Sequence, residues 1–459
     1  MKQVVNQYQP DPEILARMTA DARRLVENQS LQEGYPFDQS VNLSGYYRWL
    51  ADTGLCDLTL INVGDPYKKD WDMLHTDYYE QASIDFLARS LGFAVSDALP
   101  SGSRAHWGVL TNGGTDSNMH GVYYGRKYLE DVAAQMGLDQ ARRKPILYVS
   151  EEAHYSVRKL GDILQIETRM IRAIPFDRSR HLRGNELLPD NYPPNGQMDV
   201  DDLRQKMDPT RPALIAIAIG GTFKGAIDDQ KAIDAVIREV NPPCVYRHLD
   251  AALFGGYLPW LDDVSEKEVD AFTAARRGDQ PSQTPAIPEY LKPICDVLNQ
   301  QKQGFDSIAV SGHKFIAMNE PLGIFVCRKE VLDHLHTYSV PYLNGVIPTI
   351  SCSRSGFDCL KLYWRIMTTG PDGFRAETKH VLKMTHLLMD RLHEAGVPTF
   401  VNPYSTTVLI PKPSDSVVHR YAMACSEYPD LGSLAHVVVM QFFTEELIER
   451  LVNDIVIAQ

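Results

Sequence analysis

Residues 213–219 read Ala-Leu-Ile-Ala-Ile-Ala-Ile and contain no polar side chain. An apolar run of this length is typical of a central strand that is covered on both faces, as in parallel sheets. Strand-like runs recur on both sides of it, and helical patterns separate most of them. Such alternation predicts an α/β fold with a parallel or mixed sheet. The expected strands span residues 107–110, 146–150, 213–219, 244–250, 307–310 and 323–327, and the expected helices lie near 116–129, 154–163, 199–207 and 228–240.

The chain outside this alternating region has other patterns. Two helical stretches, near 12–28 and 42–51, predict an N-terminal arm. After about residue 330, one long helical pattern precedes two strand-like runs and a closing helix. We therefore expect an arm at 1–60, a large domain at 61–330 and a small C-terminal α+β domain at 331–459. The C-terminal elements are expected near 372–395, 406–410, 436–440 and 444–457, and polar excursions at 176–197 and 262–304.

Composition excludes several classes of partner. The 459 residues carry a net charge of −13, which argues against general binding to nucleic acid or to anionic membranes. The N-terminus has no apolar run of signal-peptide length, and no stretch of about 18 apolar residues follows, so we expect a cytoplasmic protein. Seven cysteines without a CxxC pair favour buried thiols, and no metal site is expected.

A glycine pair follows the first expected strand, in Thr111-Asn112-Gly113-Gly114-Thr115. Backbone N–H groups at the start of a helix bind anions, and the Thr115 hydroxyl adds a donor. This loop therefore predicts a phosphate cradle formed by Gly113, Gly114 and Thr115. A tight turn with a helix cap is the alternative.

Three polar side chains follow other expected strands. His154 could stack on a flat ligand at the carboxyl edge of the sheet. Asp250, among small and apolar neighbours, would need a cationic partner such as a pyridinium nitrogen. Lys314 follows Gly312 at a strand end, where a lysine that loses its charge becomes a nucleophilic amine. Taken singly, these are a structural histidine, a helix cap and a surface lysine, but one pyridoxal phosphate group would explain all of them.

The chain resembles the pyridoxal-phosphate-dependent group II amino-acid decarboxylases, above all the bacterial histidine decarboxylases and the plant serine decarboxylases. The resemblance implies an aspartate-aminotransferase-like fold (fold type I), with a mixed, mostly parallel sheet and a small C-terminal domain. It also implies a homodimer with the site at the interface. The matching segments are 34–36, 62–66, 111–121, 154–157, 225–229, 249–253, 311–314, 353–356 and 435–440.

The resemblance also carries roles onto matching positions. Lys314 would be the Schiff-base lysine, Asp250 the partner of the pyridine nitrogen and His154 the ring that stacks on the cofactor. Tyr342 matches a mobile-loop tyrosine that returns a proton to Cα after carbon dioxide leaves. The positions expected to bind the cofactor are Gly113, Gly114, Thr115, His154, Thr222, Asp250, Ser311, His313, Lys314 and Ser353.

Departures from the family pattern lie near the expected substrate side. Its usual Gly-Thr-Thr reads Gly221-Thr222-Phe223, and its usual Ser-Arg-Asn-Gly-His reads Ser353-Arg354-Ser355-Gly356-Phe357. We expect decarboxylation of a histidine-like or small polar L-amino acid to the amine. The alternatives are another pyridoxal phosphate reaction, such as decarboxylation-dependent oxidative deamination, retro-aldol cleavage or elimination, or a non-catalytic binding homologue.

Overall fold

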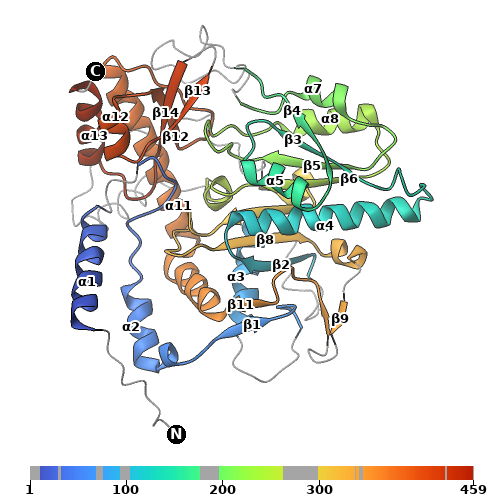
Figure 1. Ribbon diagram of the computed structural model, residues 1–459, viewed down its shortest axis with the longest axis horizontal. Coiled ribbons are helices and arrows are strands. Elements are labelled where there is room, and N and C mark those ends of the chain that lie inside the picture. The colour runs from blue at the N-terminus through green and yellow to red at the C-terminus, as the bar shows by residue number, and fades with distance from the viewer. Residues whose placement is uncertain are drawn as a thin grey trace.

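A seven-stranded mixed sheet forms the centre of the molecule in the computed structural model (Figure 1). Its strand order is β2-β8-β7-β6-β5-β3-β4. Only β8 is antiparallel to its neighbours, so the mostly parallel sheet expected from the sequence is confirmed. The strands are β2 (His106–Thr111), β3 (Ile146–Ser150), β4 (Glu167–Ile171), β5 (Ala213–Ala218), β6 (Val245–Asp250), β7 (Ser307–Ser311) and β8 (Gly323–Arg328). The structure describes residues 11–28, 33–68, 76–93, 104–175, 196–261, 298–335, 338–340, 345–428 and 432–457.

The alternating side chains of β5 show why its sequence is apolar throughout. Ile215 and Ile217 enter one hydrophobic core, whereas Leu214 and Ala216 enter another on the opposite face. Successive side chains of a strand point to opposite faces, so a strand covered on both sides has no polar alternation. Helices cover both faces, and α4 lies along one of them (Figure 1). The helices of this region are α3 (Asp77–Ser90), α4 (Gly114–Gln135), α5 (Tyr155–Ile163), α7 (Val200–Lys206), α8 (Gln230–Val240) and α10 (Gln300–Gln303).

The edge strand β4 was not predicted. Its residues, Glu-Thr-Arg-Met-Ile, are mostly polar, and its pairing is with β3 alone. An edge strand needs no continuous apolar character, because one of its sides is open to solvent or loops. The sequence therefore carries little signal for it.

The C-terminal elements form a second layered unit with its own hydrophobic core (Figure 1). The sheet order there is β12-β14-β13, antiparallel throughout. The predicted long helix is present but belongs to a longer element, interrupted where Gly370 has φ 62° and ψ 175°. Pro371 follows, which explains why the sequence pattern begins at 372. The elements are α11 (Gly356–Glu394), β12 (Thr407–Pro411), α12 (Asp415–Arg420), β13 (Ala424–Tyr428), β14 (Gly432–Val438) and α13 (Glu445–Ile457).

The N-terminal segment contains the two predicted helices, α1 (Pro12–Glu27) and α2 (Ser44–Thr53). Two small antiparallel pairs lie elsewhere: β1 (Ile61–Val63) with β11 (Ser353–Ser355), and β9 (Tyr338–Val340) with β10 (Gly345–Ile347). The predicted division at residues 60 and 330 stays a prediction, and the excursions at 176–197 and 262–304 lie almost wholly outside the described residues. Among the described helices, none has the length and apolar character that a membrane crossing requires.

Candidate active site

The carboxyl ends of the parallel strands meet at one edge of the sheet. Thr111 at the end of β2 and Ser311 at the end of β7 both pair with Gly323 of β8. Because β8 is antiparallel to both strands, β2 and β7 point the same way and end level with each other. The glycine loop and the segment that contains Lys314 therefore start from the same edge, where open α/β sheets bind their ligands.

A cavity of about 370 Å³ opens at this edge. It brings together nine of the ten positions that the sequence analysis assigns to the cofactor. The arm and the C-terminal unit contribute to its walls as well, through Tyr35, Pro36 and Val438 among others. The nine predicted positions in its lining are Gly113, Gly114, Thr115, His154, Thr222, Asp250, Ser311, His313 and Lys314.

The glycine loop packs directly against the end of β7. Gly113 has φ 85°, a left-handed conformation that favours glycine, and it precedes the first turn of α4. A Cβ added to Gly114 would lie 2.4 Å from Oγ of Ser311, and one on Gly113 would lie 3.7 Å from Cε1 of His313. The loop thus leaves exposed backbone N–H groups at a helix N-terminus, with hydroxyl and imidazole groups beside it. This arrangement fits a phosphate group.

Lys314 lies at the cavity in a tight turn. Its backbone N–H donates to the Ser311 carbonyl at 3.3 Å, and its own carbonyl accepts from the N–H of Ala317 at 2.9 Å. Burial lowers the pKa of Lys314, and the negative charge of Asp250 partly opposes this shift. A lysine whose pKa is lowered has a larger neutral, nucleophilic fraction at neutral pH.

His154 caps the N-terminus of α5 beside the cavity. Its Nδ1 lies 2.6 Å from Oγ of Ser156, which fixes the orientation of the ring. Burial lowers the pKa of His154; the charge of Asp250 opposes the shift, and that of Lys314 adds to it. A lowered pKa favours the neutral imidazole at pH 7, and His154 lines the cavity.

Asp250 ends β6 with its side chain buried. One carboxylate oxygen accepts from Nδ2 of Asn118 at 3.0 Å, and the other accepts from the backbone N–H of Ala252 at 3.3 Å. Donors on both oxygens fix the orientation of the carboxyl group. A buried carboxylate at the wall of this cavity fits the protonated nitrogen of a pyridine ring.

Two predicted positions are not placed in this cavity. Ser353 lies on β11 and lines a second cavity of about 260 Å³, which shares only Asn112 with the first. Its assignment to cofactor binding stays a prediction. Tyr342 lies outside the described residues.

Several residues of the site were not assigned a role from the sequence. Asn118 sits in the glycine-loop motif, one turn along α4, but only the crossing of α4 over β6 brings it to Asp250. His436 lines the cavity from β14, with its Nδ1 3.0 Å from the Phe223 carbonyl oxygen and its Nε2 3.2 Å from that of Gly34. A histidine in an apolar strand gives no sign of such long-range contacts.

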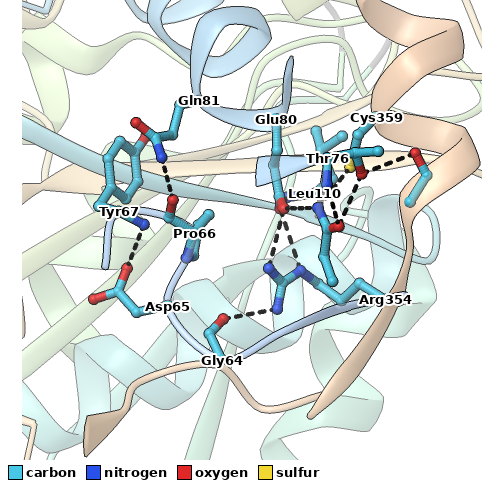
Figure 2. Close-up of polar contacts among 12 residues, drawn as sticks. Gly64, Asp65, Pro66, Tyr67, Thr76, Glu80, Gln81, Leu110, Arg354 and Cys359 are labelled. Carbon is cyan, nitrogen blue, oxygen red and sulfur yellow. Dashed lines mark hydrogen bonds and ion pairs between the residues drawn. The ribbon is translucent and has the colours of Figure 1, made fainter. Parts of the chain in front are cut away.

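A buried polar network near the site joins two motifs that are far apart in the sequence (Figure 2). Asn62 of β1 pairs with Arg354 of β11 in the strand register. Arg354 donates to both carboxylate oxygens of Glu80 and, at 2.9 Å, to the carbonyl of Gly64. The Asn62 side chain also bonds Glu80, at 3.0 Å. The network fixes the 62–66 loop against α3.

Comparison with known proteins agrees with this geometry. Residues 80–259 match the family model described as the pyridoxal-dependent decarboxylase conserved domain. Serine decarboxylase 1 of Oryza sativa subsp. japonica is 29% identical over 440 residues, covering 94% of this chain and 73% of the relative. Histidine decarboxylase of Morganella morganii is 28% identical over 436 residues, covering 94% and 93%. The chain is therefore similar, over most of its length, to amino-acid decarboxylases of the pyridoxal-dependent family.

Solved structures show the same fold. The L-methionine decarboxylase of Streptomyces sp. 590 superposes with a TM-score of 0.75 at 21% identity, covering 99% of this chain and 98% of the other. The glutamate decarboxylase of Lactobacillus brevis CGMCC 1306 gives a TM-score of 0.70 at 18% identity, covering 99% and 93%. The fold is therefore the aspartate-aminotransferase-like fold type I. The enzyme is a pyridoxal-phosphate-dependent amino-acid decarboxylase, and its cavity fits the cofactor at the glycine loop, at Asp250 and at Lys314.

Proposed function

We propose that this decarboxylase converts an L-amino acid with a histidine-like or small polar side chain to the corresponding amine and carbon dioxide. The observation that carries the proposal is the convergence of Lys314, His154 and Asp250 on one cavity beside the glycine loop. These groups come from three different strand ends, so their meeting is a property of the whole sheet.

Each of these residues has a distinct task in the proposed reaction. When bound, the cofactor supplies a ring that accepts the electron pair left by the departing carboxylate. Lys314 provides Nζ as the attachment point, and Asp250 holds a proton at the ring nitrogen. His154 packs its flat face on the ring. The Gly113–Thr115 loop, with Ser311 and His313, anchors the phosphate, and Thr222 contacts the cofactor from the end of β5.

Proton return to Cα is assigned to Tyr342, on the basis of the family resemblance alone. A tyrosine hydroxyl can donate a proton at this position if a loop brings it to the substrate. Replacement Tyr342→Phe should then slow amine formation and divert part of the product to an aldehyde or ketone. An unchanged rate with unchanged product would remove Tyr342 from the mechanism.

The residues that line the cavity favour a substrate whose side chain carries no charge. Apart from the residues assigned to the cofactor, the lining includes Tyr35, Pro36, Leu253 and Val438. Among the described lining residues, Asp250 is the only carboxylate, and it is assigned to the ring nitrogen. The cationic side chain of lysine or arginine would therefore find no ionic partner in these walls.

We also propose that the enzyme is a homodimer in which the partner completes the site. Helix α1 buries none of its side chains in the single chain. Its exposed apolar residues fall within one face of the helix, which a second copy would cover. They are Ile14, Leu15, Met18, Leu25 and Val26. From the family resemblance alone, the segment 338–353 would serve the partner's site. The expected cytoplasmic location stays a prediction.

A panel of L-amino acids, read by mass spectrometry with oxygen uptake and carbon dioxide release recorded together, tests the function. Amine and carbon dioxide without oxygen uptake are the expected products. Ketone, aldehyde or ammonia would instead assign another pyridoxal phosphate reaction to the same site.

The purified protein should also show a visible absorbance band of bound cofactor that is lost in Lys314→Ala. A colourless protein that stays colourless with added pyridoxal phosphate would contradict the proposal.

A further inference from the structure

Three elements meet behind the carboxylate of Asp250. Side chains two residues apart on a strand point to the same face, so His248 and Asp250 of β6 both face α4. The ring of His248 occupies the space beside Gly121 of α4, where an added Cβ would lie 2.1 Å from Cε1 of the imidazole. Asn118, three residues earlier on α4, lies over both side chains. The close approach of α4 to β6 therefore depends on a glycine at 121.

A continuous chain of side-chain hydrogen bonds runs through this contact. Ser307 Oγ lies 2.8 Å from Nδ1 of His248, and the strand register pairs these two residues across β6 and β7. His248 Nε2 lies 2.9 Å from Oδ1 of Asn118. Asn118 Nδ2 then donates to Oδ2 of Asp250 at 3.0 Å. The chain thus runs from Ser307 through His248 and Asn118 to Asp250.

The direction of every donor in this chain is determined. Asp250 as a carboxylate only accepts, so Asn118 must turn its amide nitrogen toward it and its oxygen toward His248. Nε2 of His248 must then carry the proton, and Nδ1 must accept from the Ser307 hydroxyl. Complete burial lowers the pKa of His248 to about 3, so the ring stays neutral and keeps this tautomer at working pH.

We propose that Asn118 and His248 are positioning residues that hold the Asp250 carboxylate in its orientation toward the ring nitrogen of the bound cofactor. The inference rests on the role of Asp250 in the proposed function. If Asn118 turned over, its amide oxygen would face the carboxylate, and His248 prevents this by donating to that oxygen. Lys314, His154 and Asn118 all line the cavity beside Asp250, whereas His248 does not line it and reaches Asp250 only through Asn118.

The first test compares holoenzyme variants. Asn118→Leu removes the hydrogen bond to the charged Asp250, and kcat should fall by about 10- to 100-fold with KM nearly unchanged. His248→Leu removes the donor that holds Asn118 in this orientation, and kcat should fall in the same direction. Both should also weaken the affinity of the apoenzyme for pyridoxal phosphate, measured by dialysis, and shift the pH midpoint of the cofactor's visible absorbance. His248→Gln, which keeps an N–H donor for Asn118, should recover most of the rate.

His106→Leu is the matched control. His106 is another buried histidine, on β2, whose Nε2 bonds Asp85 at 2.9 Å and which does not line the cavity. Its loss should change stability but neither the absorbance midpoint nor kcat. If His248→Leu behaves like this control in every readout, the positioning role is wrong.

The second test reads the unaltered enzyme, and a variant serves only to assign its signals. In the ¹⁵N NMR spectrum of histidine-labelled holoenzyme, assigned with His248→Gln, the His248 ring should be protonated at Nε2 and should not titrate between about pH 5 and pH 8. Protonation at Nδ1, or titration in this range, would contradict the proposed direction of the hydrogen bonds. If the unaltered enzyme binds cofactor and releases amine but His248 is protonated at Nδ1 or titrates in this range, only this inference is wrong. If the unaltered enzyme does not bind pyridoxal phosphate, the proposed function is wrong.

Discussion

Arg354 and Glu80 form a buried ion pair that joins β11 to α3 (Figure 2). Arg354 Nη2 lies 3.0 Å from Oε2 of Glu80, and Nε lies 3.2 Å from Oε1. The carboxylate also accepts from the backbone N–H of Leu110 and from Nδ2 of Asn62, each at 3.0 Å. A buried pair with its remaining hydrogen bonds satisfied is costly to break from one side only, because the other charge then stays buried without compensation.

Replacement of Glu80 by glutamine should therefore destabilise the protein strongly. Glu80→Gln leaves the guanidinium of Arg354 buried without a counter-charge, and we expect the free energy of unfolding to fall by about 3–5 kcal/mol. Urea unfolding of the apoenzyme measures it. Asp21→Asn is the control: Asp21 pairs with Arg24 on the exposed surface of α1, and a change under about 1 kcal/mol is expected there. Equal losses in both variants would contradict the assignment.

The sequence indicated which residues would converge on one cavity, because these residues follow strand ends. A parallel sheet aligns those ends, so order along the chain translates into proximity once the strands are recognised. His154, Asp250 and Lys314 were found in this way, together with the glycine loop. Edge strand β4 and the short pair β1–β11 were missed because strands of three to five residues are too short to carry a periodic apolar signal, and most side chains of β4 and β11 are polar.

Residues that act through packing between elements were harder to predict. The contact of Asn118 with Asp250 joins residues 132 positions apart and depends on the angle at which α4 crosses β6. Gly121 permits that crossing, but a glycine within a helical pattern does not say what approaches it. The placement of Ser353 in a second cavity also follows from the β1–β11 pairing, which the sequence did not indicate.

The charge of Asp250 should be essential for turnover. Asp250→Asn keeps the shape of the side chain but removes the negative charge at the ring-nitrogen position, and kcat should fall by about 100-fold or more. Asp228 is the matched control, since burial raises its pKa to about 6 and it accepts from the N–H groups of Met198 and Ala218, each at 2.7 Å. Asp228→Asn should retain most of the activity in the same steady-state assay. Near-native turnover of Asp250→Asn would remove Asp250 from the chemistry.

The contact between Gly114 and Ser311 predicts a compensating pair of substitutions. Gly114→Ala places a Cβ 2.4 Å from Oγ of Ser311, so the end of β7 must shift, and the apoenzyme should lose about 1–3 kcal/mol of stability. Ser311→Ala removes that oxygen, and the double variant should regain much of the lost stability. Thermal unfolding of the four proteins measures the coupling. Affinity for pyridoxal phosphate should stay reduced in the double variant, because the hydroxyl donor is gone; additive losses in stability would argue against the contact.

Assembly should depend on the apolar face of α1. Ile14→Glu with Met18→Glu places two charges on that face, where both side chains are more than half exposed in the single chain. Light scattering after size-exclusion chromatography should show dimers for the unaltered enzyme and dissociation for this variant. Arg23→Glu with Glu27→Lys, on the opposite side of the same helix, should leave the mass unchanged. A monomeric unaltered enzyme would contradict the proposed homodimer.

The buried carboxyl of Glu33 should make stability depend on pH. Its side chain is fully buried between the arm and the C-terminal unit, and neither carboxyl oxygen accepts a hydrogen bond from another described residue. Burial raises the pKa of Glu33 from 4.5 to about 7, although its own backbone N–H, Arg450, 4.0 Å away, and Arg420 oppose the shift. The folded protein therefore binds a proton that the unfolded chain releases at lower pH.

Stability should accordingly decrease as pH rises from about 4.5 to about 7, and the loss should be complete above the folded-state pKa. Glu33→Gln removes this titration, so the variant should unfold at a higher temperature than the unaltered enzyme at pH 8 and at nearly the same temperature at pH 5. Thermal unfolding across this range measures the difference, with the exposed Glu27→Gln as control. Because Gly34 and Tyr35 line the cavity directly after Glu33, KM should rise with pH in the unaltered enzyme more than in Glu33→Gln. Parallel pH profiles for Glu33→Gln and Glu27→Gln would show that this carboxyl does not titrate in the folded protein.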